Sequence, residues 1–69
     1  MNSKDSKNFV KSIYSDAYAS KLGSFGYIIM HGTFPHCKYF AVNHPLTIKK
    51  AWIEAANEIS EAMMWKLEH

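Results

Sequence analysis

Apolar residues in the first quarter of the chain recur at helical spacing after a largely polar beginning. Residues 1–6 show no apolar period, so we predict a disordered N-terminal arm that leads to a helix cap at Asp5 or Ser6. The apolar positions that follow are Phe9, Val10, Ile13 and Ala17. They predict a short helix, which ends at the turn-forming residues Ser15 and Asp16.

The middle of the chain contains two runs that are typical of β-strands. Residues 27–30 form a continuous apolar run after a glycine-rich turn, and residues 37–42 are rich in aromatic and β-branched residues. Residues 32–35 break the pattern between them, so the two runs predict a hairpin-like pair. Residues 17–22 form either a third extended segment or a loop, and both alternatives stay open.

A second, longer helix is predicted after Pro45. Proline disfavours helix at the residue before it, and Thr47 is a good N-cap. The apolar positions that follow are spaced four, three, four and three residues apart: Ile48, Trp52, Ala55, Ile59 and Ala62. This stripe predicts an amphipathic helix that packs against the strands. The predicted fold class is therefore α+β, with the order α-β-β-β-α, or α-β-β-α if residues 17–22 are a loop, and with two helices packed on one face of a small antiparallel sheet.

Both faces of the predicted sheet carry apolar side chains. On the strand at 27–30, Tyr27 and Ile29 point to one face, and Ile28 and Met30 point to the other. Two helices cover one face of a small sheet, so the other face needs a partner, most simply a second copy of the chain. The residues predicted at this homodimer interface are Tyr27, Ile29, Tyr39, Met64 and Trp65. In the alternative interpretation, these side chains coat a half-exposed surface without any partner.

Length and composition narrow the choice of architecture. The chain has 69 residues, enough for one small domain, which we predict over residues 7–66; 48% hydrophobic and 20% charged residues are typical of a folded protein. Residues 67–69 look like the remnant of a purification tag. No apolar stretch approaches the roughly 20 residues of a membrane helix, so we expect no membrane association. The one cysteine, Cys37, cannot form an internal disulfide, which favours a cytoplasmic location.

Residues of the types found in metal and catalytic sites lack the spacing that such sites require. His31, His36, Cys37 and His44 have the chemistry of zinc ligands. Structural zinc sites usually show two close pairs, however, and adjacent residues on a strand point to opposite faces. For Cys37 to act as a nucleophile, an orienting acid and an oxyanion hole are needed, and the sequence has no motif for them. We therefore expect no bound metal, no cofactor and no enzymatic activity.

Two lysines in the first turn of the predicted second helix form a candidate anion site. Lys49 and Lys50 lie where the helix macrodipole is positive and acidic residues are preferred. Their ammonium groups and the free backbone N–H groups of that turn suit a phosphate, and Lys38 and His44 could extend the patch. An ordinary exposed lysine pair is the alternative interpretation. The chain has no arginine, so any nucleic-acid contact would depend on shape and backbone phosphates.

The residues around the two predicted helices resemble a known pattern. The pattern is Tyr-x-Asp-Ala, two or three strands, and Thr-x-x-x-Ala-Trp-x-x-Ala; its residues here are Tyr14, Asp16, Ala17, Thr47, Ala51, Trp52 and Ala55. Small uncharacterised phage and prophage proteins are similar to this chain over about residues 8–60. No activity is assigned to that group. The resemblance implies a phage or prophage context and no mechanism. Our leading hypothesis is a small phage-type interaction module that dimerises through its sheet face and binds a host or phage protein.

A second, weaker similarity is to the double-stranded RNA-binding domain, whose element order is α-β-β-β-α. Pro35 and His36, followed by Phe40 and Val42, resemble the strand pattern of that family. The residues that resemble the start of its second helix are Thr47, Lys49, Ala51, Ala55 and Ala56. This resemblance implies the alternative function, which is nucleic-acid binding by shape and phosphate contacts.

Overall fold

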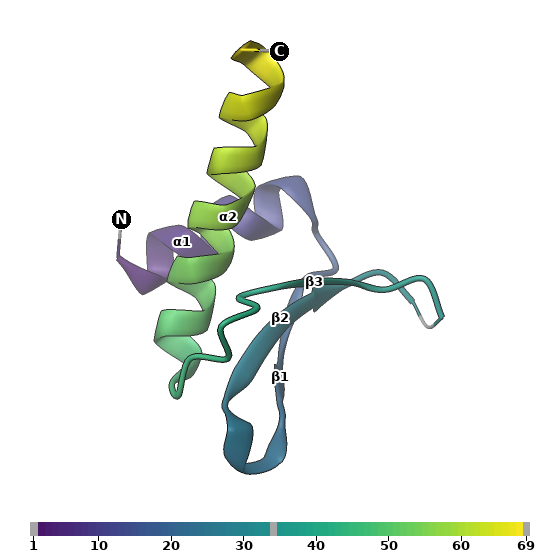
Figure 1. Cartoon of the computed structure of the whole chain (residues 1–69), viewed down its shortest axis with the longest axis vertical. Helices are drawn as coiled ribbons and strands as arrows, with labels where there is room; N and C mark the ends of the chain where they lie inside the picture. The colour runs from purple at the N-terminus through teal and green to yellow at the C-terminus, as the bar shows by residue number, and fades with distance from the viewer. Residues whose placement is uncertain (1, 34, 69) are drawn as a thin grey trace.

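The structure, a computed structural model, describes residues 2–33 and 35–68, with side chains up to residue 66. Its elements are α1 (Ser3–Ile13), β1 (Tyr18–Lys21), the short 3-10 helix η1 (Gly23–Phe25), β2 (Tyr27–His31), β3 (Lys38–Phe40) and α2 (Ile48–Glu68) (Figure 1). This order confirms the predicted α+β fold of the α-β-β-β-α type. The segment at 17–22 therefore contributes a strand and is not a loop.

Helix α1 begins earlier than the sequence pattern predicted. The Oδ1 atom of Asn2 accepts a hydrogen bond of 2.8 Å from the backbone N–H of Asp5, so Asn2 is the N-cap. Asparagine caps a helix as well as aspartate or serine does, and Asp5 in the first turn is favoured by the helix macrodipole. The predicted cap at Asp5 or Ser6 is therefore wrong, and so is the disordered arm from Ser3 onward. Residue 1 lies outside the described residues.

Three antiparallel strands form the sheet in the order β1-β2-β3. Ile29 of β2 pairs with Ala19 of β1 on one side and with Phe40 of β3 on the other. Just before β2, Gly26 has a φ of 116°, and a Cβ atom built there would overlap the carbonyl oxygen of His44. Glycine is therefore required where the loop before α2 lies against the sheet.

Strand β3 is shorter than the strand predicted at 37–42. Ala41 and His44 have φ values of 61° and 53°, which lie in the left-handed region. The backbone N–H of His44 donates a hydrogen bond of 3.0 Å to the carbonyl of Ala41 and closes a turn. Val42, predicted within the strand, lies in this turn and is exposed. The pairing of β3 with β2 therefore ends at Phe40.

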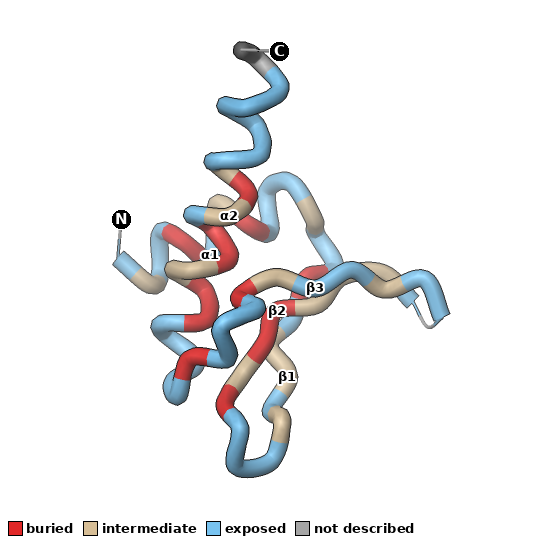
Figure 2. The backbone as a smooth tube through the Cα atoms, in the orientation of Figure 1, coloured by how far each residue is buried: buried red, intermediate tan, exposed pale blue. Residues whose placement is uncertain are grey.

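Both helices lie on the same side of the sheet (Figure 1). Helix α2 packs against all three strands, and α1 packs mainly against α2. The buried core cluster consists of Val10, Ala17, Ile29, Ala41, Ala51, Trp52, Ala55, Ala56 and Ile59. Figure 2 shows these buried positions gathered where α1, α2 and β2 meet. The packing of the helices on one sheet face confirms the predicted layer arrangement.

Helix α2 begins where the sequence predicted and extends beyond the core. The Thr47 Oγ1 atom accepts a hydrogen bond of 3.2 Å from the backbone N–H of Lys50, which confirms Thr47 as the N-cap. Buried positions of α2 occur up to Ile59, and residues 61–66 are all exposed. The last turns of α2 project away from the rest of the molecule (Figures 1 and 2).

Replacing Trp52 tests the packing of this small core. Trp52 is 5% exposed, and Trp52→Ala removes a large ring from the core, so we expect the free energy of unfolding in urea to fall by about 3–5 kcal/mol. Phe25→Ala is the control, because the Phe25 ring is 75% exposed and its loss should change stability by less than about 0.5 kcal/mol. Equal urea midpoints for the two variants would contradict the packing described here.

Candidate interaction surfaces

A row of three side chains crosses the sheet face that points away from the helices. Tyr18 of β1 pairs with Met30 of β2, and Met30 pairs with Tyr39 of β3. Tyr18 is 45% exposed and Tyr39 is 55% exposed, while Met30 is half-buried. Ile28 belongs to the same face and is buried. We call the row Tyr18, Met30 and Tyr39 the open sheet face.

Two of the residues predicted at a dimer interface lie on the opposite, helix-covered face. Ile29 is completely buried in the core, and Tyr27 packs against that core. The prediction of Tyr27 and Ile29 at the interface is therefore wrong, whereas Tyr39 does lie on the open face. A strand that is apolar at every position does not indicate which of its two faces the helices cover. The residues on the open sheet face that the prediction missed are Tyr18 and Met30.

A second apolar surface lies where α2 leaves the core. A pocket of about 160 Å³ opens between the end of α1, strand β3 and the outer part of α2. Its lining residues are Ile13, Tyr14, Phe40, Ile59, Ala62, Met63 and Lys66, and we call this set the distal α2 surface. The predicted interface residues Met64 and Trp65 are exposed on the same projecting helix end. The structure thus separates the predicted interface into two surfaces.

Aromatic stacking fixes one wall of this pocket. The Tyr14 ring stacks on His31 with centroids 3.9 Å apart, and the Phe40 ring lies 5.5 Å from each of them. The carboxylate of Asp16 accepts a hydrogen bond of 2.7 Å from the backbone N–H of Gly32, which ties the turn after α1 to the end of β2. The end of α1 and the sheet therefore hold the wall of the pocket in one geometry.

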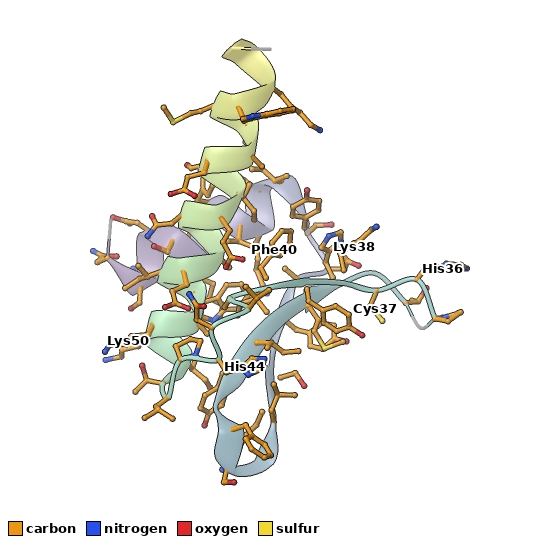
Figure 3. The ribbon with its side chains drawn as sticks, in the orientation of Figure 1. His36, Cys37, Lys38, Phe40, His44 and Lys50 are labelled. Carbon is orange, nitrogen blue, oxygen red and sulfur yellow. The ribbon has the colours of Figure 1, made fainter. Side chains whose placement is uncertain are left out.

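The four candidate metal ligands are not brought together. His31 belongs to the aromatic stack, and Figure 3 shows His36 and Cys37 in the loop between β2 and β3, well separated from His44 near the start of α2. Among the side chains that the structure describes, within residues 2–33 and 35–66, no group of three or more histidine, cysteine, aspartate or glutamate residues could hold a metal ion.

The predicted lysine patch is divided between two sides of the molecule. Lys49 and Lys50 are exposed in the first turn of α2. Figure 3 shows Lys50 near the start of α2 and Lys38 well apart from it, toward the loop that carries His36 and Cys37. Lys38 therefore does not extend the patch, because the strand that carries it starts far from the N-terminus of α2.

Helix α1 carries a stripe of lysines that the sequence analysis did not single out. Lys4, Lys7 and Lys11 are three and four residues apart, so they share one side of α1, and all three are exposed. The Nζ atom of Lys7 lies 5.6 Å from the centroid of the Trp52 ring. Lys49 is three residues before Trp52 on α2, so its backbone lies about one helical turn from the residue that Lys7 approaches. The lysine spacing is visible in the sequence, but the packing of α1 on α2 is not.

Glutamates line a second pocket, which lies on another side of α2. The pocket has a volume of about 240 Å³ and is lined by Val42, Asn43, Glu54, Asn57, Glu58 and Glu61. The Glu58 carboxylate accepts a hydrogen bond from the backbone N–H of Ala41, one of the residues with a positive φ. Glu58 therefore holds the turn after β3 against α2, so its carboxylate has a structural role.

In the part of the chain that the structure describes, no helix combines the length and the apolar character needed to cross a membrane. Comparison with known proteins gave no match, neither to a protein-family model nor to a curated protein or a solved structure. The function is therefore argued from the surfaces themselves.

Removal of the Glu58 carboxylate tests whether its hydrogen bond with the Ala41 N–H stabilises the fold. Glu58→Ala leaves the Ala41 N–H without its charged acceptor, so we expect the free energy of unfolding to fall by about 1.5–3 kcal/mol at neutral pH. Glu61→Ala is the control, since Glu61 is exposed and lines the same pocket. If Glu58→Ala and Glu61→Ala have the same free energy of unfolding, the hydrogen bond contributes nothing to stability.

Proposed function

We propose that this protein is a non-enzymatic protein-interaction module of the small phage or prophage type, and that it acts as a homodimer in the cytoplasm. One observation carries this proposal: after α2 leaves the core, it exposes four consecutive apolar residues at positions 62–65. Met63, Met64 and Trp65 are 48%, 60% and 61% exposed, and together with Ala62 they point in four directions about 100° apart. Neighbouring exposed apolar residues are typical of an interaction surface, and a second copy is the simplest cover.

The size and lining of the pockets support a binding role over catalysis. Their volumes of about 160 and 240 Å³ are below the range of about 300–1,000 Å³ that is usual for small-molecule sites. Neither Cys37 nor a histidine is among the lining residues. The phage context rests on the resemblance over residues 8–60, and the cytoplasmic location rests on the single cysteine.

The mass in solution tests the homodimer. We expect multi-angle light scattering at tens of micromolar protein to give twice the chain mass of 7.9 kDa, and the mass should fall on dilution as a dimer dissociates. A mass of 7.9 kDa that persists up to millimolar protein would refute the proposal.

The lysines of α1 and α2 favour nucleic-acid binding as a second candidate function. Lys4, Lys7 and Lys11 add three exposed ammonium groups on α1, and Lys7 approaches Trp52 of α2. Lys49 and Lys50 lie at the positive N-terminus of α2, where an anion is favoured. The element order shared with the double-stranded RNA-binding domain also supports this candidate. Without arginine, such binding would read the shape and phosphates of a duplex more than its sequence.

Salt-dependent binding to double-stranded RNA tests the second candidate. We expect the affinity to fall steeply between low and moderate salt, and Lys49→Ala with Lys50→Ala should reduce the slope of log affinity against log salt by about one for each lost phosphate contact. Lys38→Ala is the control, because Lys38 lies away from the patch. Binding that neither salt nor the double substitution changes would exclude this function.

A further inference from the structure

The pocket of the distal α2 surface reaches from solvent to the core. Ile59 belongs to its lining and is only 4% exposed, whereas Ile13 and Met63, which also line it, are 38% and 48% exposed. Every described lining residue except Lys66 is apolar or aromatic. Water in contact with such a lining is less favourable than an apolar group, so the pocket is suited to an apolar occupant.

The size of the pocket matches a single aromatic side chain. Its volume of about 160 Å³ is close to the roughly 150 Å³ of an apolar protein cavity that holds one benzene molecule. Two of its lining residues, Tyr14 and Phe40, are aromatic, and pairs of aromatic rings gain stability beyond the area that they bury. A phenylalanine side chain of another protein therefore fits this pocket.

Contacts outside the pocket hold its wall in place. The Tyr14 ring stacks on His31, and the Asp16 carboxylate accepts a hydrogen bond from the backbone N–H of Gly32. His31, Asp16 and Gly32 are not lining residues, so these contacts do not depend on an occupant. Because the wall is already fixed, an entering side chain does not have to order it, and that makes binding more favourable.

The charge at the pocket favours a carboxylate beside the entering ring. Lys66 is exposed, and it is the one charged residue among the described lining residues. Three glutamates of α2 line the other pocket instead: Glu54, Glu58 and Glu61. A carboxylate next to the entering ring would therefore meet an ammonium group and none of these three glutamates.

We infer that the distal α2 surface binds an acidic segment of a partner protein, which inserts one phenylalanine side chain into the pocket and places a carboxylate on Lys66. This inference rests on the proposed interaction function and names the chemistry of the partner. Such a contact does not need the area of a stable dimer, because one side chain anchored in a pocket gives an interface of the weak, transient class.

A pair of small probes tests the pocket and its charge preference. N-acetyl-phenylalanine carries the ring beside a carboxylate, and N-acetyl-phenylalanine amide carries the same ring without a charge. We expect both probes to shift the methyl NMR signals of Ile13 and Met63 in a saturable way, with Kd values in the millimolar range. At low salt, the carboxylate probe should bind about two- to fivefold more tightly than the amide. No saturable shift, or equal Kd values for the two probes, would overturn the inference.

Two lysine substitutions test the role of Lys66. Lys66→Gln should remove the difference between the two probes, because the neutral side chain no longer attracts the carboxylate. Lys50→Gln is the control, since Lys50 lies in the first turn of α2 and Lys66 in its last. A preference for the carboxylate probe that survives Lys66→Gln would contradict the proposed contact.

Filling the pocket separates failure of this inference from failure of the homodimer. Ala62→Trp adds a large ring at a lining position and should abolish binding of both probes, whereas Glu61→Trp, at an exposed position of the other pocket, should not. Equal helicity by circular dichroism verifies that both variants fold, and binding that Ala62→Trp leaves unchanged overturns the inference. Light scattering on the unsubstituted chain reports the homodimer independently. A dimer that binds neither probe overturns only this inference, and a monomer that prefers the carboxylate probe overturns only the homodimer.

Discussion

The close approach of α2 to α1 and the sheet is the contact on which the rest of the structure depends. Ala51, Ala55 and Ala56 are 0–2% exposed, and their small side chains bring the helix backbone near its neighbours. Trp52 and Ile59 complete the cluster on the same helix. A domain of this size buries only about 60% of its unfolded surface, so little else can hold α1 in place. The stripe that forms the core is also the stripe that extends into solvent beyond it.

The sequence predicts the elements of this fold better than their boundaries. Helix α2 and its cap at Thr47 were predictable, because one apolar stripe and one capping side chain indicate both. The start of α1 was not, because its first turn is polar and leaves no apolar period to detect. The end of β3 depends on the positive φ of Ala41, which the contact with Glu58 stabilises from a helix far along the chain. Such a tertiary contact has no local signal.

A candidate surface was predictable from the sequence when its residues belong to one helix or strand. It was not predictable when several elements contribute residues to it. Lys49 and Lys50 lie in one helical turn, and the structure keeps them together. The prediction that Lys38 joins them is wrong, because the sequence does not reveal that the start of β3 and the start of α2 lie apart in the fold. The distal pocket joins three elements through Ile13, Phe40 and Met63, so only the packed structure reveals it. Its one local signal is the continuation of the α2 stripe past Ile59.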